Sequence, residues 1–276
     1  MIRIAGSDDL HKVVLINPKG GCGKTTLATN LASFFALRGS QPTIIDCDPQ
    51  GYCIRWLEKR PSDRAGCYGI EGYAANAKEP IEVPPDSKLA IIDLPAAIPY
   101  ADLHAYTHMA DSILLPIVPS AIDVYAASRF VAELMLDVQL DRNERKLAIV
   151  ANRVNSRTRS YEMLKRFLTS LRIPMIATLR DSQVYVHAAA SGLGIFELPS
   201  HLVKNDLPQF SAITQWLDRP RSRPSAERER ESPAADVPRD YKEYRYNDSD
   251  QQQRRFGESG TGRQDTREEE RRPERG

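Results

Sequence analysis

Hydrophobic positions along the chain fall into two alternating kinds of segment. Short continuous apolar runs, rich in Val, Ile and Leu, are typical of strands that are buried on both faces. Longer segments with apolar residues at helical spacing are typical of amphipathic helices. We predict strands over residues 13–16, 43–45, 88–93, 112–118, 146–151 and 175–177, and helices over residues 27–37, 52–59, 100–110, 121–136, 161–171, 184–190 and 206–217.

The alternation of strands and helices predicts an α/β fold, with a parallel sheet that is covered by helices on both faces. Residues 60–86 interrupt the alternation, because they are rich in Pro, Gly and small polar residues. We expect a connection with one short strand in this segment.

The hydrophobic pattern ends at Asp218. Residues 219–276 contain 15 Lys and Arg and 14 Asp and Glu among Ser, Pro and Gln, with few aliphatic residues. A segment of that composition buries too little apolar surface to offset the entropy of ordering. We therefore predict one folded domain over residues 1–218 and a disordered charged tail over residues 219–276.

Composition narrows the class of protein. The 276 residues carry a formal net charge of +1, so no overall field favours nucleic acid or a membrane. The four cysteines contain no C-x-x-C pair, which indicates reduced thiols. The N-terminus lacks the apolar core of a signal peptide, and no apolar run approaches the roughly 18 residues of a membrane span. We expect a soluble cytoplasmic protein with no membrane partner.

A glycine-rich loop lies between the first predicted strand and the first predicted helix. Its residues are Lys19, Gly20, Gly21, Cys22, Gly23, Lys24, Thr25 and Thr26. Strand, glycine-rich turn and helix form the setting that a phosphate-binding loop requires. The glycines let several backbone N–H groups converge on one anion, and the helix adds its positive N-terminal end. We expect Lys24 to reach the β- and γ-phosphates of a nucleotide and Thr25 to bind the phosphate-bound Mg²⁺.

Polar residues also follow three other predicted strands. Asp46 and Asp48 follow the second strand, Asp93 ends the third, and Asn152 follows the fifth. These are candidate site residues, because α/β sheets bind ligands at the carboxyl ends of their strands. For Asp46, capping of the following helix is an open alternative, and an Asn-Arg pair after a strand can be only a turn.

Four motifs occupy these places in chain order: K-G-G-C-G-K-T-T, D-C-D-P-Q-G, I-I-D-L-P-A and A-N-R. Together they resemble the ParA/MinD family of deviant Walker ATPases, over residues 11–217. The resemblance implies a P-loop ATPase with a doubly wound, mostly parallel sheet and with ATP and Mg²⁺ as cofactors. It also implies a homodimer in which two subunits clasp two ATP molecules face to face, and slow ATP hydrolysis that a partner stimulates.

The resemblance assigns catalytic roles to three residues. Lys19 matches the signature lysine, which contacts the phosphates of the partner subunit's ATP and stabilises charge that develops during phosphoryl transfer. Asp48 matches the aspartate that positions the attacking water, so Lys19, Lys24 and Asp48 are the implied catalytic residues. Ser120 and Asp123 follow the fourth predicted strand, where Asp123 fits a helix cap as well as a switch residue.

The resemblance also implies how metal and base are held. Asp93 matches the Walker B carboxylate and Asp46 would lie near the metal, so Thr25, Asp46 and Asp93 are the implied magnesium site. Asn152 matches an asparagine that reads the adenine edge, since its amide supplies both a donor and an acceptor. Arg153 would pack against the base.

Family members use ATP as a timer for positioning. The resemblance implies that this protein positions or segregates a cargo, either DNA or a large protein assembly, with an activating partner or cargo adaptor. The ParA branch binds DNA non-specifically through basic residues, and here basic residues surround one predicted helix: Arg157, Arg159, Lys165, Arg166 and Arg172. Contacts with DNA phosphates would be salt-sensitive and would place the protein on the nucleoid. An ordinary solvated helix face is the open alternative.

Other classes share parts of this pattern. A bacterial tyrosine kinase also uses deviant Walker motifs, and the tail contains Tyr241, Tyr244 and Tyr246. A MinD-like regulator would act on another surface, because the end of the tail has no apolar face for a membrane. Iron–sulfur relatives need cysteines beyond the Walker B strand, and none follows Cys67. A metabolic ligase of the same superfamily stays open.

Overall fold

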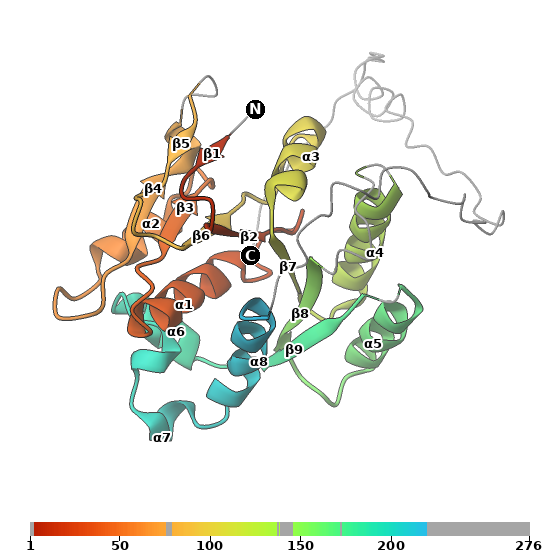
Figure 1. Ribbon diagram of the computed structural model, residues 1–276. Coiled ribbons are helices and arrows are strands. Elements are labelled where there is room, and N and C mark those ends of the chain that lie inside the picture. Colours follow the sequence, from red (N-terminus) through yellow and green to blue (C-terminus); the bar gives the residue numbers. More distant parts are fainter. Residues whose placement is uncertain (1–2, 76–78, 137, 139–145, 172, 220–276) are drawn as a thin grey trace, which may run out of the picture. The chain divides into compact units, whose positions relative to one another are not determined.

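A seven-stranded parallel sheet is the main feature of the computed structural model (Figure 1). The structure describes residues 3–75, 79–136, 138, 146–171 and 173–219. All of these belong to one compact unit, residues 1–224, and the second unit, residues 225–276, lies outside the described residues. The predicted disordered tail therefore lies outside them, apart from Arg219. The same holds for the tail tyrosines Tyr241, Tyr244 and Tyr246.

The strands of the large sheet have the spatial order β4-β3-β6-β2-β7-β8-β9. Their bounds are Tyr68–Glu71 for β4, Thr43–Asp46 for β3, Leu89–Asp93 for β6, His11–Leu15 for β2, Ser112–Ile117 for β7, Leu147–Val154 for β8 and Met175–Arg180 for β9. Every neighbouring pair is parallel. Parallel neighbours need long crossover connections, which explains the helices between the strands.

Strand β2 lies where the winding of the sheet reverses. The chain leaves β2 through α1 (Lys24–Leu37) toward β3 on one side, and it reaches β7 on the other side of β2 after α3 (Tyr100–Met109). Open parallel sheets bind ligands outside the carboxyl ends of the strands at such a point. The loop that follows β2 therefore lies at the expected binding edge.

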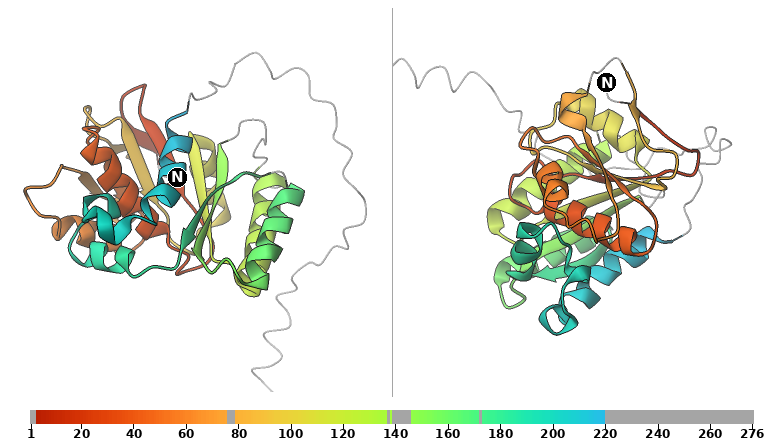
Figure 2. Two further views of the ribbon diagram at one scale, coloured as in Figure 1. Left: turned by 90° about the horizontal axis from the view of Figure 1, so that it is seen from below. Right: turned by 90° about the vertical axis from the view of Figure 1, so that its left-hand side faces the viewer.

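Helices cover both faces of the sheet (Figure 2). The core on one face contains residues of α1, α2 (Tyr52–Glu58), α6 (Val184–Ala190), α7 (Ser200–Val203) and α8 (Leu207–Leu217). The core on the other face contains residues of α3, α4 (Ala121–Leu136) and α5 (Arg159–Leu171). Val13 and Leu15 of β2 belong to the first core, and Val14 belongs to the second. Burial on both faces is the reason that the strands are continuous apolar runs in the sequence.

The predicted doubly wound α/β class is confirmed, but the expectation of one short strand in residues 60–86 is wrong. This segment contains β4, a 3-10 turn at Gly72–Ala74 and β5 (Ile81–Glu82). β5 pairs in parallel with β1 (Ile4–Ala5), which the pattern did not predict. Two more short elements were not predicted, α7 and the 3-10 helix η3 (Ile195–Glu197). Such short pieces are defined by tertiary contacts, so they leave no periodic signal in the sequence.

The described helices are modest in length. The longest of them, α4, has 16 residues. Within the described residues, no helix combines the length and the apolar character that are needed to cross a bilayer.

Candidate functional site

The glycine-rich loop connects β2 to α1 at the carboxyl edge of the sheet. Gly21 and Gly23 have φ angles of 75° and 99°, which residues with a side chain rarely adopt. The carbonyl oxygen of Gly23 accepts the N–H of Leu27 at 3.0 Å and so begins the hydrogen-bond ladder of α1. The positive N-terminal end of α1 is therefore directed at the loop, as an anion site requires.

Asn152 of β8 lies against this loop. Its buried side chain donates from Nδ2 to the carbonyl oxygen of Cys22 at 2.8 Å, and its Oδ1 accepts the backbone N–H of Arg153 at 3.0 Å. A Cβ atom added to Gly23 would overlap Nδ2 of Asn152, so the packing of Asn152 also requires glycine at position 23. Asn152 thus supports the glycine-rich loop, and its contact with adenine stays a prediction.

Arg153 lies at the exposed end of the same strand. Its φ angle is 52°, in the left-handed region, and its Nε lies 3.4 Å from Oδ1 of Asp181, which follows β9. The side chains of Asn152 and Arg153 therefore take opposite environments, one buried and one exposed. The predicted packing of Arg153 against a base stays a prediction.

Lys24 is buried against the loop that precedes it. Its Nζ donates to the carbonyl oxygen of Asn17 at 3.2 Å and lies 3.5 Å from that of Lys19. Asn17 is held at both ends of its amide: Nδ2 donates to the carbonyl oxygen of Pro116 at 2.6 Å, and Oδ1 accepts the N–H of Lys19 at 2.8 Å. Asn17 was not among the expected site residues, and its place directly before the loop was the only signal for it. It fixes the start of the loop to the end of β7.

Lys19 forms an ion pair with Asp123 in the first turn of α4. The side chain of Lys19 is 42% exposed and that of Asp123 is 14% exposed. Asp123 also makes capping contacts: its backbone N–H donates to Oγ of Ser120 at 3.1 Å, and the Ser120 hydroxyl donates to its carboxylate. Ser120 is therefore the residue that caps α4, and Asp123, in the first turn, accepts its hydroxyl and joins α4 to the glycine-rich loop.

Asp93 ends β6 with a carboxylate that is 1% exposed. Its Oδ2 accepts the hydroxyl of Thr25 at 2.6 Å and the thiol of Cys53 at 3.3 Å. Its Oδ1 has no hydrogen-bond partner among the described residues. Burial raises the pKa of the Asp93 carboxyl to about 6, although the two donors and the charge of Lys24 oppose this rise.

Asp46 lies beside Asp93, in register with it on the neighbouring strand β3. Its Oδ2 accepts the N–H groups of Cys53 at 2.9 Å and Ile54 at 3.3 Å, in the first turn of α2, and its Oδ1 accepts the N–H of Asp48 at 3.1 Å. Burial raises the pKa of the Asp46 carboxyl above its usual value, although these backbone donors oppose the rise. Asp46 therefore makes helix-capping contacts, and its place near a metal stays a prediction.

Asp48 lies in the turn between β3 and α2. Its carbonyl oxygen accepts the N–H of Gly51 at 2.8 Å, and its Oδ1 accepts the N–H of Gln50 at 3.0 Å. Gly51 has a φ angle of 63° and directly precedes α2. The turn holds the half-buried Asp48 just beyond the carboxyl end of β3, at the same edge of the sheet as the loop.

The groups around Asp93 suit a magnesium ion in a nucleotide site. The Thr25 hydroxyl donates its proton to Asp93, so the lone pairs of its oxygen stay available to a metal. Oδ1 of Asp93 is a second oxygen without a partner among the described residues. Mg²⁺ in such sites takes few protein oxygens and completes its shell with phosphate and water. In the described part of the chain, no group of three or more His, Cys, Asp and Glu side chains is arranged to hold a metal.

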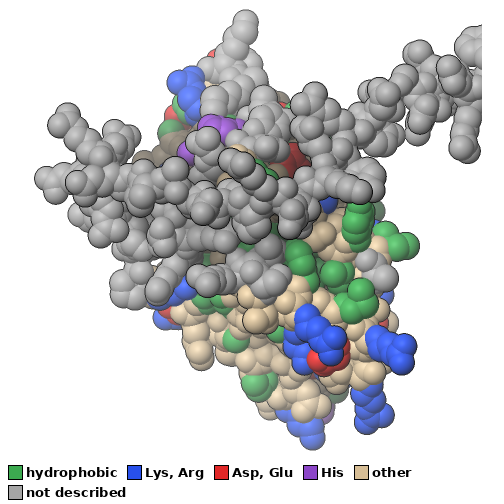
Figure 3. All heavy atoms as spheres, turned by 90° about the vertical axis from the view of Figure 1, so that its right-hand side faces the viewer, with side chains coloured by type: hydrophobic (Ala, Val, Ile, Leu, Met, Phe, Trp, Pro, Cys, Tyr) green, Lys and Arg blue, Asp and Glu red, His purple; other side chains and the backbone are tan. Residues whose placement is uncertain are grey.

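The predicted DNA-contact residues lie on and just before α5. Figure 3 shows Lys and Arg side chains around a smaller acidic area on the side of the molecule that carries α4 and α5. Arg157, Arg159 and Arg166 are exposed and form no ion pair within the described residues. Lys165 is half-buried and pairs with a neighbouring glutamate at 2.6 Å. Arg172 lies outside the described residues.

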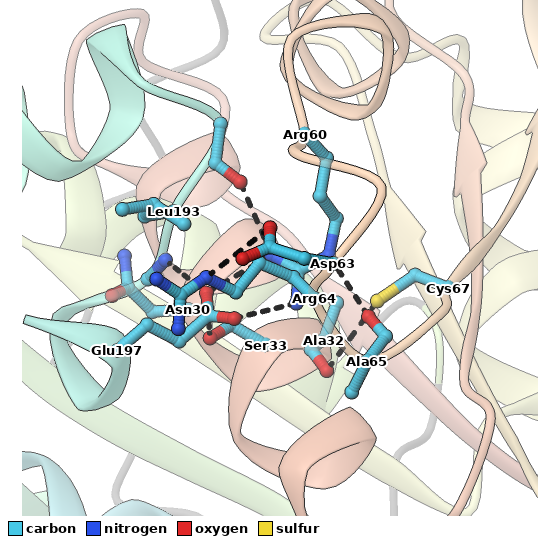
Figure 4. A network of polar contacts seen from close by, with 12 residues as sticks. Asn30, Ala32, Ser33, Arg60, Asp63, Arg64, Ala65, Cys67, Leu193 and Glu197 are labelled. Carbon is cyan, nitrogen blue, oxygen red and sulfur yellow. Dashed lines mark hydrogen bonds and ion pairs between the residues drawn. The ribbon is translucent and has the colours of Figure 1, made fainter.

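A buried ion pair connects the turn after α2 to η3, and a further hydrogen bond joins it to α1 (Figure 4). Arg60 donates two hydrogen bonds to the carboxylate of Glu197, at 2.7 and 2.9 Å, and Ser33 of α1 donates a third at 2.8 Å. Burial is the largest single effect on the pKa of the Glu197 carboxyl and raises it, but these hydrogen bonds together hold the pKa below its usual value. The network was not predicted, because one Arg and one Glu that are 137 positions apart form no sequence motif.

Known proteins match both the sequence and the fold. The CobQ/CobB/MinD/ParA nucleotide binding domain matches residues 13–195. The maintenance of carboxysome distribution protein A of Halothiobacillus neapolitanus is 25% identical over 197 residues, which are 70% of this chain and 89% of that protein. The protein of the same name from Gloeobacter kilaueensis is 27% identical over 209 residues, 75% of this chain and 94% of that protein.

Among solved structures, the apo form of McdA from Cyanothece aligns with a TM-score of 0.56. The alignment covers 75% of this chain and 99% of that structure, at 16% sequence identity. At that identity the likeness shows the fold alone.

Proposed function

Because the chain belongs to the CobQ/CobB/MinD/ParA family of nucleotide-binding domains, we propose that it is an ATPase that dimerises on ATP and positions a cargo in the cell. Its hydrolysis of ATP is slow and is stimulated by a partner protein. The proposal rests on the glycine-rich loop itself. The loop has two glycines with left-handed φ angles, and the helix that it begins carries the buried Lys24 and the hydrogen bond from Thr25 to Asp93.

The chemistry of the loop supports binding of ATP with magnesium. The backbone N–H groups of the loop and the N-terminal end of α1 would hold phosphate oxygens, and Lys24 would neutralise charge at the β- and γ-phosphates. Thr25 and Asp93 would hold Mg²⁺, directly or through water. Asp48 would orient the attacking water, and Lys19 of a second subunit would stabilise the transferred phosphoryl group.

The relatives favour a protein assembly as the cargo. The two relatives described above are named for the maintenance of carboxysome distribution. Because these matches cover 89% and 94% of the relatives, the likeness extends well beyond the glycine-rich loop. We therefore propose a large protein assembly as the cargo, connected through an adaptor or activating protein.

Non-specific DNA is the proposed surface on which the dimer moves. Arg157, Arg159 and Arg166 support this, because they are exposed and are not neutralised by carboxylates of the described residues. A protein that neutralises several DNA phosphates releases counterions, so its affinity falls steeply as salt rises. Binding of this kind carries no base specificity.

The decisive experiment measures binding of the purified protein to random-sequence duplex DNA, with ATP, with ADP and without nucleotide, across a salt series. We expect binding with ATP alone, and a steep loss as salt rises. Charge reversal at any one of Arg157, Arg159 and Arg166 should weaken it. Reversal of Arg64, an exposed arginine in the loop after α2, is the matched control and should leave binding unchanged.

Different results would remove different parts of the proposal. An absence of DNA binding with every nucleotide would remove DNA as the surface and direct attention to a protein scaffold. ATP turnover that survives Lys24→Ala would remove the assignment of the loop as the ATPase site.

A further inference from the structure

Cys53 contacts the carboxylates of two neighbouring strands. It lies in the first turn of α2, and its side chain is 0% exposed. Its backbone N–H donates to Oδ2 of Asp46 at 2.9 Å, and its thiol donates to Oδ2 of Asp93 at 3.3 Å. One residue can reach both carboxylates because Asp46 and Asp93 are in register on β3 and β6.

The two oxygens of the Asp93 carboxylate have different surroundings. Oδ2 accepts two donors, the hydroxyl of Thr25 and the thiol of Cys53. Oδ1 is buried and has no partner among the described residues. A buried carboxylate oxygen without a partner is unfavourable until a cation or a water reaches it. The two donors on Oδ2 restrict rotation of the carboxylate and leave Oδ1 as the oxygen for a further ligand.

We propose that Cys53 is a positioning residue of the magnesium site. Its thiol holds Asp93 by Oδ2, keeps Oδ1 available to the metal or to a metal-bound water, and links that carboxylate to the helix that follows Asp48. The inference rests on the proposed function, since it concerns the same nucleotide site.

A buried cysteine can also serve only as a small apolar side chain. The position of the Cys53 sulfur distinguishes it from that case, because it lies within hydrogen-bond distance of a carboxylate oxygen. Cys67 offers the contrast within the same chain: its sulfur is 3.7 Å from the carbonyl oxygen of Ala32 and contacts no carboxylate in the described residues.

The position of Cys53 also connects two parts of the site. The turn that contains Asp48 ends at Gly51, and α2 begins at the next residue. A displacement of this turn would therefore carry the thiol donor with it. Through Cys53, the segment that holds the proposed water-positioning Asp48 is mechanically linked to the proposed magnesium carboxylate.

The test compares Cys53→Ala and Cys53→Ser with the control Cys67→Ala. A fluorescent ATP analogue reports nucleotide binding to each protein while Mg²⁺ is titrated, and again without Mg²⁺. We expect Cys53→Ala to weaken Mg²⁺ binding about 5- to 10-fold, the loss of one hydrogen bond to a charged group, with nucleotide binding unchanged when Mg²⁺ is absent. Cys53→Ser keeps a donor and should stay within about twofold of the original protein. Cys67→Ala should bind Mg²⁺ as tightly as the original protein does.

A second measurement needs neither turnover nor nucleotide. The infrared S–H stretching band of Cys53 is obtained as the difference between the original protein and Cys53→Ser. We expect this band at a lower frequency than the band lost in Cys67→Ala, because donation to a carboxylate weakens the S–H bond.

The proposal is overturned if Cys53→Ala binds Mg²⁺ like the original protein, if Cys67→Ala shows the same loss, or if the Cys53 band has the frequency of a free thiol. Should Cys53→Ala fail to fold, the infrared band decides the matter. Failure of the original protein to bind ATP with Mg²⁺ would instead contradict the proposed function, and the infrared band would still test the thiol contact by itself.

Discussion

At the residue scale, Asp93 lowers the stability of the domain in which it is buried. Burial raises the pKa of its carboxyl from 3.8 to about 6. At pH values below 3.8 the group is protonated in both the folded and the unfolded protein, so it has no effect on stability. Between pH 3.8 and about 6 the unfolded protein ionises this carboxyl while the folded protein keeps it protonated, so the unfolding free energy falls over that range and levels off above about 6. A shift of that size corresponds to about 3 kcal/mol.

Replacement of Asp93 by Asn should reveal this cost. The amide cannot ionise, so the unfolding free energy of Asp93→Asn relative to that of the original protein should rise by about 2 kcal/mol between about pH 4.5 and about pH 7.5. Urea unfolding without nucleotide or metal measures it. Asp63→Asn, at a side chain that is 74% exposed, is the control and should follow the original protein. Parallel profiles for Asp93→Asn and the original protein would contradict the raised pKa.

At the scale of elements, the segment before α7 determines how α1 and α2 are held together. Gly192 has a φ angle of 66°, and a Cβ atom added to it would lie 2.5 Å from the backbone nitrogen of Arg60. This close approach lets Arg60 donate to the Gly192 carbonyl oxygen at 3.1 Å as well as to Glu197. Loss of one partner of a buried ion pair is strongly destabilising, since it leaves the other charge unpaired.

A pair of glycine variants separates close packing from backbone strain. Gly39 also has a positive φ angle, 80°, but nothing lies within 4 Å of an added Cβ atom. Gly39→Ala should therefore cost about 1 kcal/mol of unfolding free energy, from backbone strain alone. Gly192→Ala should cost about 3 kcal/mol or more, because it also separates Arg60 from Glu197. Equal losses in urea unfolding would show that the close approach has no energetic role.

At the scale of the whole molecule, the ion pair between Lys19 and Asp123 must break for the proposed dimer to form. Within one subunit, Lys19 already has an anionic partner. In the proposed dimer the same ammonium group would contact the ATP of the other subunit, so the ion pair must open. Partly exposed ion pairs contribute about 0–1 kcal/mol, and bound phosphates can readily displace Asp123.

Sedimentation with ATP and Mg²⁺ tests this exchange. Lys19→Ala should bind ATP but remain a monomer, because the contact across the dimer is lost. Asp48→Ala should bind ATP, hydrolyse it slowly and accumulate as a dimer, because the attacking water is no longer oriented. Lys88→Ala, at an exposed lysine that pairs with Asp9, is the control and should dimerise normally. An ATP-dependent dimer of Lys19→Ala would remove the role of Lys19 across subunits.

The sequence by itself determined the α/β class, the positions of the main strands and helices, and the place of the glycine-rich loop. These features depend on local physics: continuous apolar runs for strands buried on both faces, helical spacing for the helices, and glycines where φ is positive. Gly21 and Gly23 adopt such angles, and the loop joins β2 to α1 as expected. Asp93 was also placed correctly at the end of β6, because it directly follows an apolar run.

Only the tertiary structure decided which distant groups meet. It joined Asn152 to Cys22, 130 positions away, and Arg60 to Glu197, and it paired β1 with β5. It also directed the Asp46 carboxylate to the first turn of α2. These contacts form where the packing of the elements brings polar groups together. Buried polar groups need hydrogen-bond partners, and the partner is whichever group the fold places nearby. Local patterns predict the elements, whereas those partners follow from their packing.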